Sequence, residues 1–333
     1  MRTLIWIVVV LSLLWGGYWF VGARGVETGL TAWLEARRAE GWLAEYSDIT
    51  TRGFPNRFDT TISDFELADP GTGLAWTMPD FQILTLSYTP NHIIVAFPSA
   101  QTIASPIEKI AVDSDLMRGS VVFVPKTSLE IDRTSFELSN LSVSSSLGWA
   151  TRVESGQFAT RRSADRPLAH DVYFRASRVA PSRQLLGLLD PRSVLPETFE
   201  GVTLDATVTF NAPWDRFALE RGRPDPAEIE IRTFDAGWGE ITLQAAGMLT
   251  VDTLGRPEGR LDVRARNWRD MLRVARESGL VPAKVAPTVE NALELLAGMS
   301  GNPETIDAPL TFRRGTMFFG GLPIGAAPVL TIR

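Results

Sequence analysis

Residue types that commonly perform chemistry are few in this chain of 333 residues, and they lie far apart. The chain has two histidines, His92 and His170, and no cysteine, which excludes cysteine nucleophiles, thiolate metal sites and disulfides. His170 and the adjacent Asp171 could form half of a Ser-His-Asp triad, but no Gly-x-Ser-x-Gly sequence supplies a nucleophile. A strand-end histidine at the surface is the simpler interpretation. Because the histidines also lack metal-site spacing, the sequence predicts no catalytic residue, no metal site and no cofactor.

One glycine pair superficially matches a phosphate-binding loop. The segment Gly237-Trp-Gly239 precedes an alternating apolar pattern, Ile241-Thr-Leu243-Gln-Ala245. In phosphate-binding loops the glycines instead open a helix, whose N-terminal N–H groups hold the anion. We therefore interpret this segment as a turn between two strands.

The composition indicates a folded, acidic protein. Hydrophobic residues make up 44% of the chain and charged residues 22%, which is typical of a globular protein. A formal net charge of −6 gives no electrostatic footprint for nucleic acid and argues against a basic patch for anionic lipid headgroups. We expect no nucleic-acid partner, and the composition identifies no protein partner.

The first apolar stretch, Leu4–Ala23, is long enough to cross a membrane. Its 20 residues, LIWIVVVLSLLWGGYWFVGA, contain no charged side chain and would extend about 30 Å as a helix, the hydrocarbon thickness of a bilayer. Aromatic residues gather near its end, at Trp15–Phe20, as they do at membrane interfaces. The sequence predicts a transmembrane helix over 4–23. The tail of residues 1–3 carries the amino terminus and Arg2 and is expected to be cytoplasmic.

A cleaved secretory signal is the alternative interpretation. Val21-Gly-Ala23 has the small residues of a cleavage site, but bulky aromatic residues precede it where small polar ones are usual. Both interpretations deliver residues 24–333 across the membrane. The bulky aromatic residues favour the uncleaved helix. The sequence on this interpretation predicts a single-pass protein of a bacterial inner membrane, with its N-terminus cytoplasmic and its main domain periplasmic.

Beyond the predicted span the apolar pattern changes from helical to alternating. Val26, Leu30 and Leu34 recur at helical spacing and predict an amphipathic juxtamembrane helix over residues 24–46. From residue 47 to 333 short alternating segments and Gly/Pro-rich turns predict a β-rich periplasmic domain. This domain could consist of two β-rich halves, at about 47–212 and 213–333.

Short strands in this order favour a mainly β fold with minor α. We expect a long antiparallel sheet, which could form a groove, with a few covering helices. The clearest strand has five apolar residues alternating with threonine and aspartate. These candidate groove or core residues are Val202, Leu204, Ala206, Val208 and Phe210.

The apolar face of such a sheet must be covered. Complete cover by helices would give a closed core, whereas partial cover would leave an apolar groove able to hold acyl chains. The sequence leaves both interpretations open. A groove next to a bilayer would have phospholipid, or another acyl-chain ligand, as its nearest apolar ligand.

Several segments carry a family resemblance. Tyr46–Asp59, YSDITTRGFPNRFD, combines a tyrosine with Gly-Phe-Pro and an arginine two positions on. The resemblance continues in Leu249–Val263, LTVDTLGRPEGRLDV, in Asn267-Trp268, and in two C-terminal segments, Pro309–Gly315 and Gly321–Gly325. In this order the segments resemble domain-of-unknown-function family 2125, a family of uncharacterised Gram-negative envelope proteins.

That family is in turn similar to AsmA-like envelope proteins, which have one N-terminal anchor and long β-sheets implicated in moving lipid. The resemblance implies non-catalytic binding or transfer of lipid or another envelope component, and it supplies no catalytic residue. The alternative is a structural or partner-binding envelope protein with a closed β core. A periplasmic hydrolase is a third, more distant interpretation.

Overall fold

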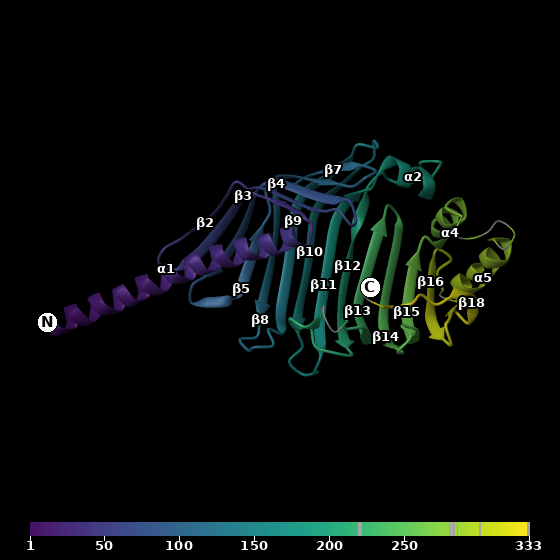
Figure 1. Cartoon of the computed structure of the whole chain (residues 1–333). Coiled ribbons are helices and arrows are strands. Elements are labelled where there is room, and N and C mark those ends of the chain that lie inside the picture. Colours follow the sequence, from purple (N-terminus) through teal and green to yellow (C-terminus); the bar gives the residue numbers. More distant parts are fainter. Residues whose placement is uncertain (219–221, 280, 282–283, 285, 300, 332–333) are drawn as a thin grey trace. The chain divides into compact units, whose positions relative to one another are not determined.

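The computed structural model is mainly β, with antiparallel strands and a long N-terminal helix (Figure 1). The predicted fold class is confirmed. The structure describes residues 1–218, 222–279, 281, 284, 286–299 and 301–331. The chain forms two compact units, unit 1 (Met1–Phe123 and Phe136–Gly148) and unit 2 (Val124–Ser135 and Trp149–Arg333).

Unit 1 combines the N-terminal helix with short and medium strands. One edge of strand β4 pairs with β3. Its other edge pairs with two strands, with β6 through Ala75–Thr77 and with β5 through Gln82–Leu86. The elements are α1 (Arg2–Ala39), β1 (Leu43–Glu45), β2 (Asp48–Arg52), β3 (Arg57–Asp69), β4 (Leu74–Leu86), β5 (Thr89–Ala96), β6 (Ala100–Ala104), β7 (Lys109–Asp113), β8 (Leu116–Phe123) and most of β9 (Ile131–Ser145).

A single helix, α1, takes the place of the two helices expected from the sequence. It runs without a break to Ala39, and the boundary predicted for the 24–46 helix is wrong. Gly41 adopts a φ of +90°, a left-handed conformation that glycine tolerates. The chain then reverses, and Leu43–Glu45 pair with Glu66–Ala68 of β3 as strand β1.

The C-terminal part of α1 packs on unit 1. Leu34 is 1% exposed and contacts a buried cluster that includes Ile62, Phe65 and Met78. Nearer the N-terminus, Trp19 contacts Phe58 in a second buried cluster. The stripe of apolar residues on this helix therefore belongs to the core of its own unit.

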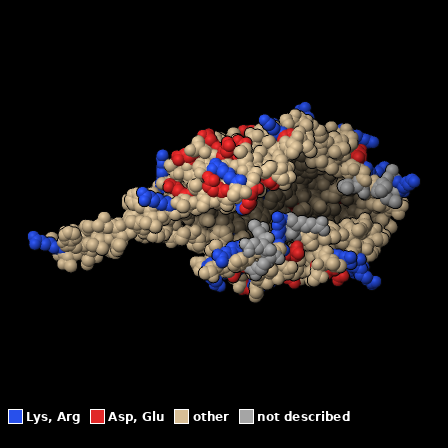
Figure 2. All heavy atoms as spheres, viewed as in Figure 1, with Lys and Arg blue, Asp and Glu red and all other residues tan. Residues whose placement is uncertain are grey.

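The N-terminal part of α1 is an exposed apolar rod. Side chains from Leu4 to Leu14 are exposed, and Figure 2 shows this part of the molecule as uncharged except at its very end. The most apolar 18-residue segment of α1 has a mean hydropathy of 2.1, and 11% of its residues are buried. Its length and composition fit a membrane anchor or a signal sequence.

Unit 2 is an antiparallel meander whose strands follow chain order. Each strand from β10 onward pairs with the next one along the chain. Its elements are β10 (Ala150–Arg162), β11 (Ala169–Ala180), α2 (Arg183–Leu189), β12 (Phe199–Phe210), β13 (Pro226–Trp238), β14 (Ile241–Val251), β15 (Pro257–Arg266), α4 (Trp268–Glu277), α5 (Ala286–Met299), β16 (Thr305–Arg313), β17 (Thr316–Phe319) and β18 (Leu322–Ala326).

This division corrects the expected halves, 47–212 and 213–333. Strands β12 and β13 flank the expected boundary and pair from Gly201↔Gly237 to Phe210↔Pro226. Because strands that share a ladder belong to one sheet, the turn signals near residue 212 mark a connection inside unit 2.

Alternation gives the sheet of unit 2 one apolar and one polar face. On the apolar face, Val202, Ala236 and Leu243 lie side by side on β12, β13 and β14. On the polar face, ion pairs such as Arg264–Asp307 (2.7 Å) join neighbouring strands. Such exposed pairs each contribute about 0–1 kcal/mol, so burial of the apolar face dominates the stability of the sheet.

Helices α4 and α5 cover one part of the apolar face. Trp268 of α4 and Ala297 of α5 are 2% and 1% exposed and share a cluster with Ile306 of β16. The Trp268 indole N–H donates to the Pro303 carbonyl at 2.9 Å. The core of unit 2 therefore lies between these helices and strands β14–β16.

The last strand, β18, differs from the others. It has five residues, all exposed, and includes Pro323. Its pairing with β17 contains a register shift between Met317 and Phe318. Within the described residues, the residue pairings of β18 are all with β17, from Thr316↔Ala326 to Phe319↔Leu322.

Candidate apolar ligand site

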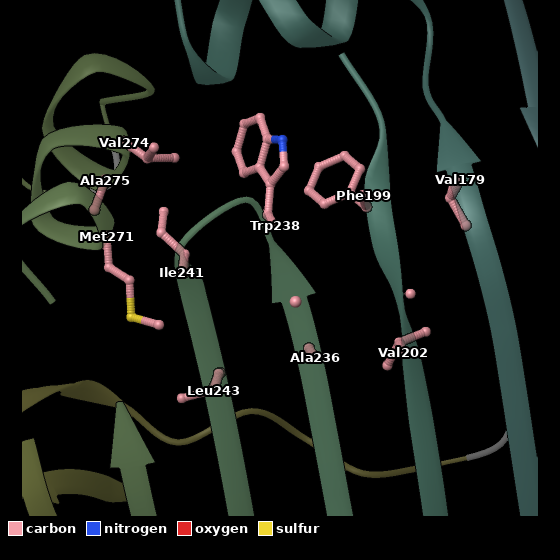
Figure 3. Close-up of a pocket in the computed structure, with 12 residues that line it drawn as sticks. Val179, Phe199, Val202, Ala236, Trp238, Ile241, Leu243, Met271, Val274 and Ala275 are labelled. Atoms are coloured by element: carbon pink, nitrogen blue, oxygen red, sulfur yellow. The ribbon is translucent and has the colours of Figure 1, made fainter. Parts of the chain in front are cut away.

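A cavity of about 450 Å³ lies in unit 2 between α4 and the sheet (Figure 3). This volume falls within the range of small-molecule sites. Uncharged residues from β11, β12, β13, β14 and α4 line it: Val179, Phe199, Gly201, Val202, Ala236, Gly237, Trp238, Ile241, Leu243, Met271, Val274 and Ala275.

Small residues form the floor of the cavity. Gly201 and Gly237 lie opposite each other on β12 and β13, next to the pair Val202↔Ala236. At Gly201, with φ +154°, a Cβ atom would lie 2.4 Å from the carbonyl oxygen of Ala176. The close approach of β11 therefore requires glycine at position 201.

Helix α4 forms the opposite wall. Met271, Val274 and Ala275 face the sheet residues Ile241 and Leu243 across the cavity (Figure 3). Methionine has three rotatable bonds and a polarisable sulfur, so it adapts to apolar groups of different shape. This wall can therefore adjust to a flexible ligand without a change in the sheet.

Two aromatic residues form a rigid end wall. The rings of Phe199 and Trp238 lie 4.4 Å apart between centroids. The Trp238 indole N–H donates to the Pro196 carbonyl at 2.7 Å, and the Gly239 N–H donates to the Glu200 carboxylate at 2.8 Å. These bonds fix the Trp238 ring, so the cavity is largely pre-formed.

The family comparison covers this site and most of the chain. Residues 19–328 match a family model described as "Uncharacterized protein conserved in bacteria (DUF2125)". The chain belongs to this family. No curated protein matches the chain significantly, and no solved structure does. The predicted resemblance to the DUF2125 family is confirmed, whereas the further similarity to AsmA-like proteins stays a prediction.

The five candidate residues of this DUF2125 chain lie on β12, and one of them lines the cavity. Val202 is that residue. Ala206 is 2% exposed, and Leu204, Val208 and Phe210 are half-buried along the same strand. The cavity thus uses the first part of the predicted strand.

The apolar face continues past the cavity and is only partly covered. Leu204 lies opposite Phe174 of β11, which lies opposite Phe158 of β10. Phe158 and Phe174 are 39% and 37% exposed. In Figure 2 the surface over β12–β14 beside α4 is hollowed, and its wall carries no charge. An apolar path therefore leads from the cavity along the sheet.

The aromatic end wall and the role of α4 were not predicted from the sequence. Apolar residues at helical spacing after Asn267, among them Met271 and Leu272, indicate a helix, but they do not indicate which strands the helix covers. Trp238 stands between two glycines, in a segment that the sequence suggests is a turn, but it is the last residue of β13 and pairs with Ile241 of β14. An aromatic residue inside a predicted turn was the available signal, since turns favour small polar residues.

The geometry of His170 and Asp171 does not suit half of a triad, in keeping with the simpler interpretation of His170 as a strand residue. The two are consecutive on β11, so their side chains point to opposite faces. His170 is 7% exposed and packs against Phe210, which corrects the expected surface position. Asp171 instead accepts from Thr207 at 2.8 Å on the polar face.

The surroundings of these two groups set their charges. Burial and the positive charge of Arg162 lower the pKa of His170 below its usual value. Burial alone would raise the pKa of Asp171, but hydrogen bonds from Thr207 and Arg161 outweigh it and hold that pKa below its usual value. His170 is therefore neutral and Asp171 ionised near pH 7.

The other histidine has a structural contact in unit 1. His92 on β5 shares a hydrogen bond of 2.9 Å with Ser120 on β8, and the two strands pair directly. Among the residues that the structure describes, no three His, Asp or Glu side chains gather as a metal site.

Proposed function

We propose that this protein is a membrane-anchored, non-catalytic binding protein that holds an acyl chain of a lipid in the cavity of unit 2. The observation that carries this proposal is the uncharged lining of the cavity, which continues into the half-exposed Phe158–Phe174 surface. An acyl chain is long, flexible and without hydrogen-bonding groups. It matches a narrow apolar path better than a compact polar metabolite does.

The packing of α1 supports an uncleaved anchor. Trp15 and Trp19 donate indole N–H bonds to the carbonyls of Pro55 (3.0 Å) and Arg57 (2.7 Å). Cleavage after Ala23 would remove both donors and two members of the buried cluster with Phe58. A signal peptide is discarded from the folded protein, whereas this helix is part of the core of unit 1.

The orientation follows from the charges at the N-terminus. Arg2 and the amino terminus favour the cytoplasmic side, and long segments after a first span translocate largely regardless of charge. On this proposal the β units are periplasmic, and the anchor lies in a bacterial inner membrane. The cavity then lies on the same side as the outer leaflet, which supplies the lipid.

The anchor predicts the N-terminus of the mature protein. Intact mass spectrometry of protein purified from membranes is expected to give a chain that retains residues 2–23. The protein should also stay in the membrane fraction after alkaline carbonate. A mature chain beginning at Arg24 would establish a signal peptide and remove the anchor from the proposal.

Ligand binding can be tested with a matched pair of substitutions. Ala236→Trp fills the floor of the cavity, whereas Ala246→Trp places the same side chain opposite Asp262 on the polar face of β14. We expect Ala236→Trp to weaken binding of a fluorescent fatty-acyl probe by about tenfold or more, a change of about 1.4 kcal/mol. Ala246→Trp should bind the probe like the unmodified protein.

Two further measurements accompany this pair. Probe binding should change little with salt, because an apolar contact is not screened by ions as a charged headgroup site would be. Thermal midpoints should show both variants folded. If the unmodified protein carries no lipid after mild purification and ignores the probe, the structural or partner-binding alternative replaces this proposal.

A further inference from the structure

Unit 1 carries an exposed aromatic surface where α1 meets two loops. Phe20 stacks on Phe54 with ring centroids 5.7 Å apart. Tyr18 donates from its hydroxyl to the Ser87 carbonyl at 2.6 Å, which places the β4–β5 turn beside the helix. The exposed aromatic residues of this surface, named the aromatic tip, are Trp15, Tyr18, Phe20, Phe54 and Tyr88.

The free part of α1 is too short to cross a bilayer by itself. Exposed apolar side chains run from Leu4 to Leu14, and eleven helical residues extend about 16 Å. The hydrocarbon core is about 30 Å thick. The missing length is supplied by Trp15–Ala23, the segment against which Phe54 and Phe58 pack. A membrane that covers all of Leu4–Ala23 therefore also reaches the loops of the aromatic tip.

The polar backbone of these loops is protected at this depth. Carbonyl groups of Pro55, Arg57 and Ser87 accept hydrogen bonds from Trp15, Trp19 and Tyr18, respectively. An unpaired carbonyl in a lipid environment would cost several kcal/mol. The pairing therefore removes the main penalty for placing irregular backbone near hydrocarbon.

Two arginines mark the boundary with the headgroups. Arg24 is the first charged residue after the apolar stretch and is exposed. Trp19, which bonds to the Arg57 carbonyl, precedes it by five residues, about 7.5 Å of helix. The Arg57 side chain is 54% exposed and pairs with Asp59 at 3.0 Å. Long arginine side chains reach from such depths to lipid phosphates.

We propose that the aromatic tip is a second membrane-contacting surface, inserted into the leaflet on the side of unit 1. Its occupant is the lipid bilayer, because the tip continues the apolar surface of a helix that needs the same bilayer. Tryptophan and tyrosine favour the interface between headgroups and hydrocarbon. The proposal shares the uncleaved anchor with the proposed function and does not depend on the cavity in unit 2.

Site-directed spin labels test this proposal in the full chain. The protein has no cysteine, so Tyr88→Cys and Phe54→Cys each give a single labelling site on the tip. Thr72→Cys is the control, because Thr72 is exposed in the β3–β4 turn at the far end of β3 from Arg57. A strand of 13 residues separates the two ends by about 40 Å.

Labelled protein is reconstituted in vesicles of phosphatidylethanolamine and phosphatidylglycerol. Labels at positions 54 and 88 should be more accessible to oxygen, which concentrates in hydrocarbon, than to a water-soluble nickel chelate. The label at position 72 should show the reverse. Equal chelate accessibility at all three positions would overturn the proposal. If Phe54→Cys disturbs packing against Phe20, the label at position 88 decides, since the Tyr88 ring is 59% exposed.

Acyl-probe binding separates this proposal from the proposed function. If the aromatic tip lies outside the membrane but the protein still binds the acyl probe, the membrane-contact proposal is overturned and the proposed ligand site is not. If the aromatic tip lies in the membrane but the protein does not bind the acyl probe, the proposed ligand site is overturned and the membrane-contact proposal is not.

Discussion

Trp268→Ala is expected to lower the free energy of unfolding by about 3–5 kcal/mol. The Trp268 side chain is 2% exposed between α4, α5 and β16, so truncation removes a large buried surface and leaves a cavity that its neighbours fill only in part. The thermal midpoint of the β-sheet signal in circular dichroism should fall clearly. Probe binding should weaken as well, because Met271 and Val274 lie on the helix that Trp268 holds in place.

Two variants separate packing from hydrogen bonding at this position. Trp268→Phe keeps a ring but loses the indole donor, and the Pro303 carbonyl still accepts from Arg269 at 2.9 Å. Its loss should be smaller, with the missing hydrogen bond contributing about 1 kcal/mol. Leu295→Ala on α5 removes a side chain that is 72% exposed and should change stability by at most about 0.5 kcal/mol. Equal losses from Leu295→Ala and Trp268→Ala would contradict the packing of these helices.

Gly22→Leu is expected to detach α1 from unit 1 beside Phe58. A Cβ atom at Gly22 would lie 2.6 Å from Cζ of the Phe58 ring. The ring belongs to the buried cluster with Trp19, so it has little room to move. Overpacking of this kind costs about 1–3 kcal/mol. The variant should show a lower thermal midpoint in detergent micelles and faster proteolysis.

Gly25→Leu provides the matched control one helical turn away. A Cβ atom at Gly25 would meet nothing within 4 Å. Replacing an exposed helical glycine removes a helix penalty of up to about 1 kcal/mol, so this variant should be as stable as the unmodified protein or more so. The two substitutions should therefore act in opposite directions. A similar loss in both would mean that Phe58 does not pack against this face of α1.

Local periodicity was sufficient to predict the main elements, but not where one element gives way to the next. The helical spacing of Leu30 and Leu34 and the alternation of Val202–Phe210 each depend on one strong pattern, and each element is present. Leu43 falls within the helix expected over residues 24–46, yet it lies in strand β1. Its pairing with Ala68 of β3 is a tertiary contact, and tertiary contacts override local preference.

The residues of the candidate site could be predicted less well from the sequence than the fold could. Val202 could be selected because its strand alternates cleanly. Met271 lies on a helix that the sequence also indicates, but nothing local specifies that this helix packs beside Val202 and Leu243. The histidines illustrate the same limit. Burial of His170 depends on its contact with Phe210 across the sheet, which no pattern around residue 170 contains.

The short final strand, β18, bears on how the protein behaves when crowded. A free sheet edge is a template on which another extended chain can add, and this is a common route to aggregation. At β18 the edge is only five residues long, Pro323 has no N–H to donate, and the shift between Met317 and Phe318 disturbs the ladder. Proline and bulges limit strand addition. Copies at high concentration can therefore lie close together without joining their sheets through this edge.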